Sequence, residues 1–63
     1  MNELSLKAAR VNAGMSLEEA AKSLGCAKST LISWEKGRTY PNVPNLKKIE
    51  EVYKVDIAFI KFN

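Results

Sequence analysis

The sequence has 63 residues and a net charge of +3, enough for one small domain spanning residues 1–63. It has no histidine and one cysteine, which excludes an internal disulfide, a Cys–His catalytic pair and a zinc site of Cys and His ligands. Apolar residues make up 46% of the chain, but no apolar run approaches the ~20 residues of a membrane span. With the lone thiol of Cys26, these features favour a small cytoplasmic binding module over an enzyme, without metal, cofactor or small-molecule substrate.

Helical periodicity dominates the chain, and glycines and prolines cut it into segments of ordinary helix length. The first predicted helix spans residues 3–12. The second spans residues 16–24, where Ser16 and Glu19 have the spacing of a capping box. In such a box each side chain accepts a hydrogen bond from the backbone amide of the other residue. Gly25 supplies the left-handed residue that ends this helix.

Three further helices are predicted in the second half of the chain. The third spans residues 28–36 and starts poorly, because Ala27 has no side-chain acceptor for the free amides. Asn42 is a good N-cap for the fourth, whose apolar residues repeat at helical spacing. Asp56 caps a short fifth helix that ends near Ile60. The sequence therefore predicts an all-α fold, a compact bundle of five short helices.

The second and third helices, with the turn between them, occupy about residues 16–37 and carry the most informative pattern. Ala21 is small where the two helices must cross, and Gly25 permits the sharp reversal. Leu31 and Trp34 point the apolar side of the third helix at the second. This pattern predicts a helix-turn-helix. An ordinary αα-hairpin with a packing role alone is the alternative.

The third helix also carries a stripe opposite its apolar side, with basic ends, hydroxyl groups between them and no acidic residue. The stripe consists of Lys28, Ser29, Ile32, Ser33 and Lys36. The stripe lies at the start of residues 28–48, which contain five basic residues and one acidic residue. This excess of positive charge could form one field toward an anion such as a phosphate backbone. A helix fits the DNA major groove, about 12 Å wide, and short side chains let its backbone approach base edges. The pattern favours a DNA-reading helix over a merely solvated face.

Three motifs and several later positions, spread from about residue 6 to residue 60, are characteristic in combination. The motifs are LKAAR at 6–10, GMSLEEAAKSLG at 14–25 and STLISWEKG at 29–37, and the later positions are Pro41, Leu46, Ile49, Val52 and Val55. With these residues the chain resembles the Cro and lambda-repressor-like, or XRE-type, helix-turn-helix family of bacterial and phage transcription regulators. The second and third helices correspond to the helix-turn-helix of that family.

The resemblance implies a set of base-edge contacts, which fall to Lys28, Ser29, Ile32 and Ser33. Lysine most often reads guanine, serine bonds to several bases, and isoleucine can meet a thymine methyl group.

It also implies contacts to the DNA backbone. The amides near Ser16 and Leu17 offer a phosphate-binding helix terminus, and Arg38 and Thr39 match positions that grip the backbone. Lys36 is assigned to phosphate steering or to solubility. Many relatives carry glutamine at position 17, and the Leu17 side chain cannot make that residue's contact with phosphate.

Four residues are expected to support the structure of the domain rather than to contact DNA. Arg10 and Glu35 occupy sites where many family members have a buried ion pair that links the first helix to the third. Trp34 is expected in the core, and Cys26 as a small apolar residue rather than a reactive thiol.

A single recognition helix reads few base pairs, so the resemblance implies a homodimer on a palindromic operator of double-stranded DNA. The candidate dimer surface is the apolar C-terminal stretch with Ile57, Phe59, Ile60 and Phe62.

The sequence thus predicts a sequence-specific, double-stranded-DNA-binding transcriptional regulator, a phage or bacterial repressor. The rival hypothesis is a protein–protein adaptor or antirepressor that keeps the helix-turn-helix without reading DNA. Replacing Lys28 and Ser33 discriminates between the two, because only DNA reading requires the stripe.

Overall fold

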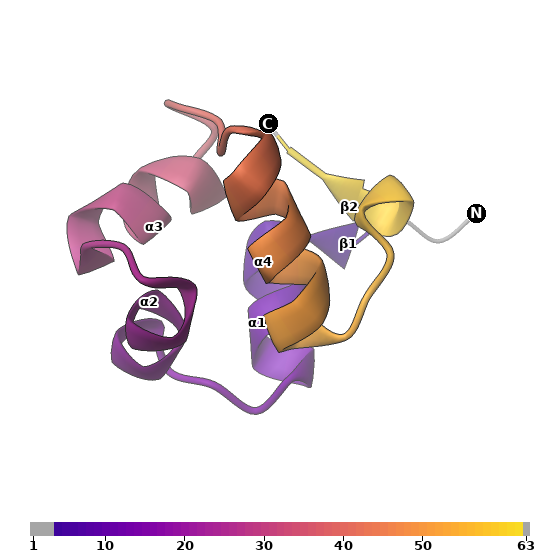
Figure 1. Ribbon diagram of the computed structural model, residues 1–63, viewed down its shortest axis with the longest axis horizontal. Coiled ribbons are helices and arrows are strands. Elements are labelled where there is room, and N and C mark those ends of the chain that lie inside the picture. The colour runs from indigo at the N-terminus through magenta and orange to yellow at the C-terminus, as the bar shows by residue number, and fades with distance from the viewer. Residues whose placement is uncertain (1–3, 63) are drawn as a thin grey trace.

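The computed structural model describes residues 4–62. Its elements, in chain order, are β1 (Leu4–Ser5), α1 (Leu6–Asn12), α2 (Leu17–Leu24), α3 (Lys28–Glu35), α4 (Val43–Tyr53), the 3-10 turn η1 (Ile57–Phe59) and β2 (Ile60–Lys61). The molecule measures 31 × 23 × 19 Å. Along its longest axis, α2 and α3 lie at one end, α1 and α4 in the middle, and the strand pair at the other end (Figure 1). None of the helices in this part of the chain is long and apolar enough to cross a membrane.

The prediction of an all-α bundle of five helices is correct for four of them. The fifth is a single 3-10 turn, which begins after Asp56 as expected, with Asp56 Oδ1 accepting a hydrogen bond of 2.9 Å from the Ala58 amide. It cannot continue as a helix, because Ile60 is extended (φ −102°, ψ 131°) and starts strand β2. Glu50 on α4 holds the turn in place by accepting a hydrogen bond of 2.8 Å from the Ile57 amide.

A short parallel strand pair joins the two ends of the described chain. Leu4 pairs with Ile60, and Ser5 pairs with Lys61. The pairing also explains why α1 begins later than predicted, since Ser5 leaves the strand and caps the helix, its Oγ accepting from the Ala8 amide at 3.0 Å. Residue 3, where the first helix was expected to begin, lies outside the described residues.

The ends of α2 and the start of α3 follow the predicted local chemistry. The capping box is confirmed: the Glu19 amide donates to Ser16 Oγ at 3.1 Å, and the Ser16 amide donates to Glu19 Oε1 at 2.9 Å. Gly25 ends the helix with φ +74°, a conformation that costs a residue with a Cβ. Ala27 makes no side-chain cap, as expected, so the first amides of α3 lack a side-chain partner.

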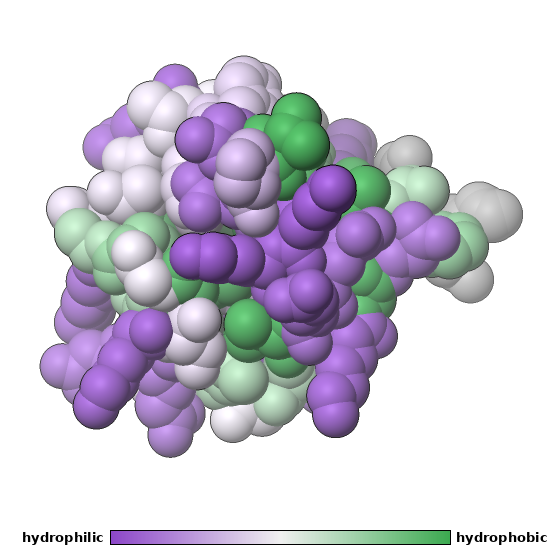
Figure 2. Space-filling view, in the orientation of Figure 1, coloured by the Kyte–Doolittle hydropathy of each residue, from purple (hydrophilic) through white to green (hydrophobic). Residues whose placement is uncertain are grey.

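Apolar side chains from every helix meet in one core. α2 packs on both α3 and α4, and α1 also contacts these two helices. The buried core residues are Leu6, Ala9, Ala20, Ala21, Leu24, Leu31, Trp34, Ile49, Tyr53 and Ile60. The prediction that Trp34 belongs to the core is therefore confirmed. On the face seen in Figure 2, hydrophilic side chains cover most of the surface, and hydrophobic ones form small separate patches.

Candidate nucleic-acid interface

The position of α3 follows from its two buried residues. Leu31 and Trp34 are 0% and 5% exposed and hold one side of the helix against the core. The opposite side therefore faces outward. It carries the predicted stripe, hereafter the α3 stripe: Lys28, Ser29 and Lys36 are exposed, and Ile32 and Ser33 are half-buried. The structure thus brings the five residues together on one face of the molecule.

The loop after α3 continues the same region of the chain. Gly37 turns the chain with φ +75°, and the Arg38 amide donates to the Ser33 carbonyl at 3.0 Å. The side chains of Arg38 and Thr39 are exposed. At the start of α2, Ser16 is exposed but its Oγ already serves as the cap, whereas Leu17 is half-buried. The first turn of α2 also carries Glu18 and Glu19, which are both exposed, and the Glu19 carboxylate already accepts a hydrogen bond from the Ser16 amide.

A buried ion pair fixes the far end of α3. Arg10 Nε donates to Glu35 Oε2 at 2.8 Å, and both side chains are 9% exposed. Arg10 also donates from Nη1 to the Met15 carbonyl at 2.9 Å. One guanidinium therefore connects α1, the last residue of α3 and the segment that leads into α2.

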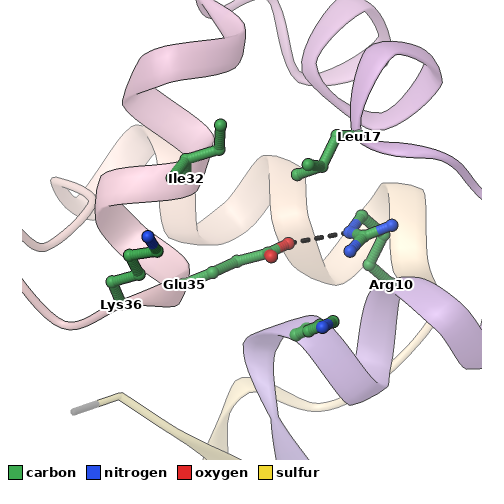
Figure 3. A pocket seen from close by; sticks show the side chains of 6 residues that line it. Arg10, Leu17, Ile32, Glu35 and Lys36 are labelled. Carbon is green, nitrogen blue, oxygen red and sulfur yellow. Dashed lines mark hydrogen bonds and ion pairs between the residues drawn. The ribbon is translucent and has the colours of Figure 1, made fainter.

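An open pocket of about 460 Å³ lies between α1, α2 and α3. Its lining residues are Lys7, Arg10, Leu17, Ile32, Glu35 and Lys36. Leu17 from α2 and Ile32 from α3 both point into this space, above the ion pair (Figure 3). Sequence reasoning treated Leu17 and Ile32 separately, one near the backbone contacts and the other among the base contacts; the structure places them in one pocket.

Lys7 is a pocket residue that sequence reasoning missed. It is exposed on α1 and lies three positions before Arg10, a spacing that puts both side chains on the same side of the helix. This spacing was the available signal. It became meaningful only once α3 was placed against α1.

A lysine of α4 that the sequence analysis did not single out lies close to the turn between α2 and α3. The Nζ atom of Lys48, on α4, lies 3.5 Å from where a Cβ at Gly25 would sit. An ammonium at this place opposes the partial negative charge at the C-terminus of α2.

Burial raises the pKa of the half-buried Cys26 thiol, and Lys48 counteracts part of that rise. Cys26 is therefore held mainly as a neutral thiol and is a poor nucleophile.

Tyr53 places a hydroxyl group in the interior. Among residues 4–62, this oxygen has no hydrogen-bond partner although it is buried. Burial raises the pKa of Tyr53 to about 12, and the negative charge of Glu35 adds to the rise. The hydroxyl is therefore neutral, and its unmet hydrogen bonds lower the stability of the domain.

The C-terminal apolar stretch is divided between core and surface. Ile60 is only 7% exposed and belongs to the core through its place in β2, so its assignment to a dimer surface is wrong. Ile57 and Phe62 pack partly against the core, and Phe59 is 52% exposed. This stretch includes η1 and β2, at the end of the molecule opposite to α2 and α3 (Figure 1).

Comparison with known proteins agrees with this geometry. A family profile described as helix-turn-helix matches residues 6–60. The chain belongs to the XRE-type helix-turn-helix family. The helix-turn-helix chain is also similar to the cryptic phage CTXphi transcriptional repressor RstR of Vibrio cholerae, with 35% identity over 49 residues, 78% of this chain and 44% of that repressor. It thus spans less than half the length of this relative. No solved structure matches the helix-turn-helix chain.

Proposed function

We propose that this protein is a transcription regulator that binds double-stranded DNA and reads the major groove with α3. The observation that carries the proposal is the α3 stripe, an outward face with lysines at both ends and no acidic residue. A solvated helix of a small domain more often mixes both charges, because interspersed signs favour solubility. A helix face that is exposed and carries only positive charges suits binding to a polyanion such as DNA.

The residues of the stripe divide by chemistry. Lys28 and Ser29, at the exposed start of α3, take the role of reading base edges, with Ser33 and Ile32 one turn later. The backbone contacts fall to Lys36, Arg38 and Thr39, and to the amides that follow Ser16 at the start of α2. The side chains of Lys36, Arg38 and Thr39 are exposed, which supports contact with phosphate groups without reading of sequence.

The sign of regulation in this proposal is repression. The relative that matches over 49 residues is a transcriptional repressor of a cryptic phage. A protein bound at a promoter can block transcription by occupying the site, which requires no further chemistry. A role as a protein–protein adaptor is the rival that the binding experiment below separates.

We further propose that two copies bind a palindromic operator, with half-sites about one helical turn, ~34 Å, apart. Within the C-terminal stretch, the apolar side chains available for contact between copies are those of Phe59, Ile57 and Phe62, of which Phe59 is the most exposed. Contiguous exposed apolar patches mark interaction surfaces, and these three side chains are the candidates for such a patch.

Selection from a pool of random DNA duplexes tests these proposals together. The purified protein is expected to enrich one sequence, and an inverted repeat within it would give the half-site spacing and the two-fold symmetry. Sedimentation with the enriched duplex then measures how many copies bind. Failure to enrich any sequence, together with retained regulation in cells, would favour the adaptor.

A further inference from the structure

We propose that the pocket between α1, α2 and α3 is a specificity site that receives the methyl-bearing edge of a thymine, with Leu17 as a base-reading residue. This inference rests on the proposed function. It assigns to Leu17 a role different from backbone contact, and it adds Lys7 to the residues that meet DNA.

The apolar part of the pocket comes from two helices. Leu17 is the first residue of α2, and Ile32 lies in the middle of the α3 stripe. Both are half-buried and both point into the same space (Figure 3). The two side chains therefore offer an apolar surface next to the residues proposed to read bases, where a polar base edge would lose its hydration without gaining a hydrogen bond.

The charged part of the pocket selects for an anionic partner. Lys7 from α1 and Lys36 from the end of α3 line it together with Arg10, against one carboxylate, Glu35. That carboxylate already accepts a hydrogen bond from Arg10 at 2.8 Å. Neither lysine forms an ion pair within residues 4–62, so both can meet phosphate, which favours an anionic nucleic acid strand over a basic or purely apolar partner.

Thymine combines the two features that the pocket requires. Among the four bases of DNA, thymine alone carries a C5-methyl group on its major-groove edge, and apolar side chains are the groups that contact it. This methyl group lies close to the sugar–phosphate backbone of its own strand. A thymine placed on Leu17 and Ile32 would thus bring a phosphate toward Lys7 and Lys36, and the open volume of about 460 Å³ has room for both.

The test removes the methyl group from the DNA rather than a side chain from the protein. In the duplex enriched by the selection, each thymine is replaced singly by deoxyuridine, which keeps every hydrogen-bonding group. At one thymine per half-site, wild-type protein is expected to bind about fourfold more weakly, the effect of about one buried CH₂ group. The same change should have no effect on binding by Leu17→Ala. Val11→Ala, which removes an exposed apolar side chain outside the pocket, should retain the full methyl dependence.

Each outcome has a distinct meaning. Loss of the deoxyuridine effect in Leu17→Ala, and its persistence in Val11→Ala, supports the site. An enriched duplex in which no thymine methyl affects wild-type binding overturns this inference and leaves the proposed function intact. The same conclusion follows if the methyl effect is equally large in Leu17→Ala. Failure to enrich any duplex rejects the proposed function itself. If Leu17→Ala does not fold, Leu17→Gln, which keeps the size of the side chain but makes it polar, replaces it with the same expectation.

Discussion

Arg10 and Glu35 are 25 residues apart in the chain, yet Arg10 Nε lies 2.8 Å from Glu35 Oε2 in a pair that is almost fully shielded from water. The same guanidinium binds the Met15 carbonyl at 2.9 Å. The pair therefore connects the first helix, the start of the helix-turn-helix and the end of the proposed recognition helix. We expect this connection to help hold α3, and with it the α3 stripe, in position.

Replacing Arg10 with alanine should lower the free energy of unfolding by about 3–5 kcal/mol, because Glu35 would remain buried without a partner. Urea denaturation followed by circular dichroism measures the loss. Lys7→Ala is the matched control, since it removes an exposed cation from the same helix and should change stability by less than about 0.5 kcal/mol. An Arg10→Ala variant as stable as wild type would reject a structural role for the pair.

The uncapped start of α3 is a place where stability can be gained. Ala27 has extended backbone angles, φ −73° and ψ 150°, which suit an N-cap, but it offers no acceptor. Ala27→Ser should raise the free energy of unfolding by about 1 kcal/mol by accepting a bond from a first-turn amide. Ala58→Ser, at another exposed position, is the comparison. Equal stabilities of Ala27→Ser and wild type would mean that water already satisfies these amides.

Tyr53→Phe should also stabilise the domain, by about 1 kcal/mol near neutral pH, because it removes a buried hydroxyl without a partner in the described part of the chain. The same change should alter the dependence on alkaline pH. In the folded state the pKa of Tyr53 is about 12, whereas an unfolded tyrosine has a pKa of about 10.

Between these two values the unfolded chain releases the Tyr53 proton while the folded protein keeps it, so wild-type stability falls as the pH rises. The advantage of Tyr53→Phe should therefore grow from pH 10 to pH 12, which denaturation at several pH values measures. A constant difference across this range would show that the hydroxyl is not buried as described.

Salt dependence tests the assignment of Arg38 to the DNA backbone. Arg38→Ala should weaken binding to specific and unrelated duplexes alike, and should reduce the slope of log affinity against log salt by about one. Lys22→Ala removes an exposed cation from α2, outside the α3 stripe and the pocket, and should leave the slope unchanged. A slope that Arg38→Ala does not alter would remove this residue from the interface.

Much of the fold could be predicted because it depends on local chemistry. The Ser16–Glu19 capping box and the turn at Gly25 are set by residues within a few positions of each other, and both are found as expected. The strand pair was missed for the opposite reason. Leu4 and Ile60 pair across nearly the whole chain, and strands of two residues are too short for any alternation to reveal them.

The candidate site likewise has a part that local sequence predicts and a part that depends on tertiary packing. Four residues of the α3 stripe lie in one helix and Lys36 follows as its C-cap, so their common face follows from helical periodicity. The pocket brings together Lys7, Leu17 and Ile32 from three helices, and its existence depends on how those helices pack. The approach of Lys48 to the turn at Gly25 is likewise a tertiary contact that spacing along the chain does not encode.

The most direct test of the central claim compares two double variants in binding to the duplex enriched by selection. Lys28→Ala/Ser33→Ala changes the α3 stripe, and Lys22→Ala/Ser23→Ala removes the same residue types from the exposed side of α2. Fluorescence anisotropy should show at least tenfold weaker binding for the first, since each good base contact contributes about 1–3 kcal/mol of discrimination, and nearly wild-type binding for the second. Wild-type affinity in a folded Lys28→Ala/Ser33→Ala protein would contradict the assignment of α3 as the DNA-reading helix.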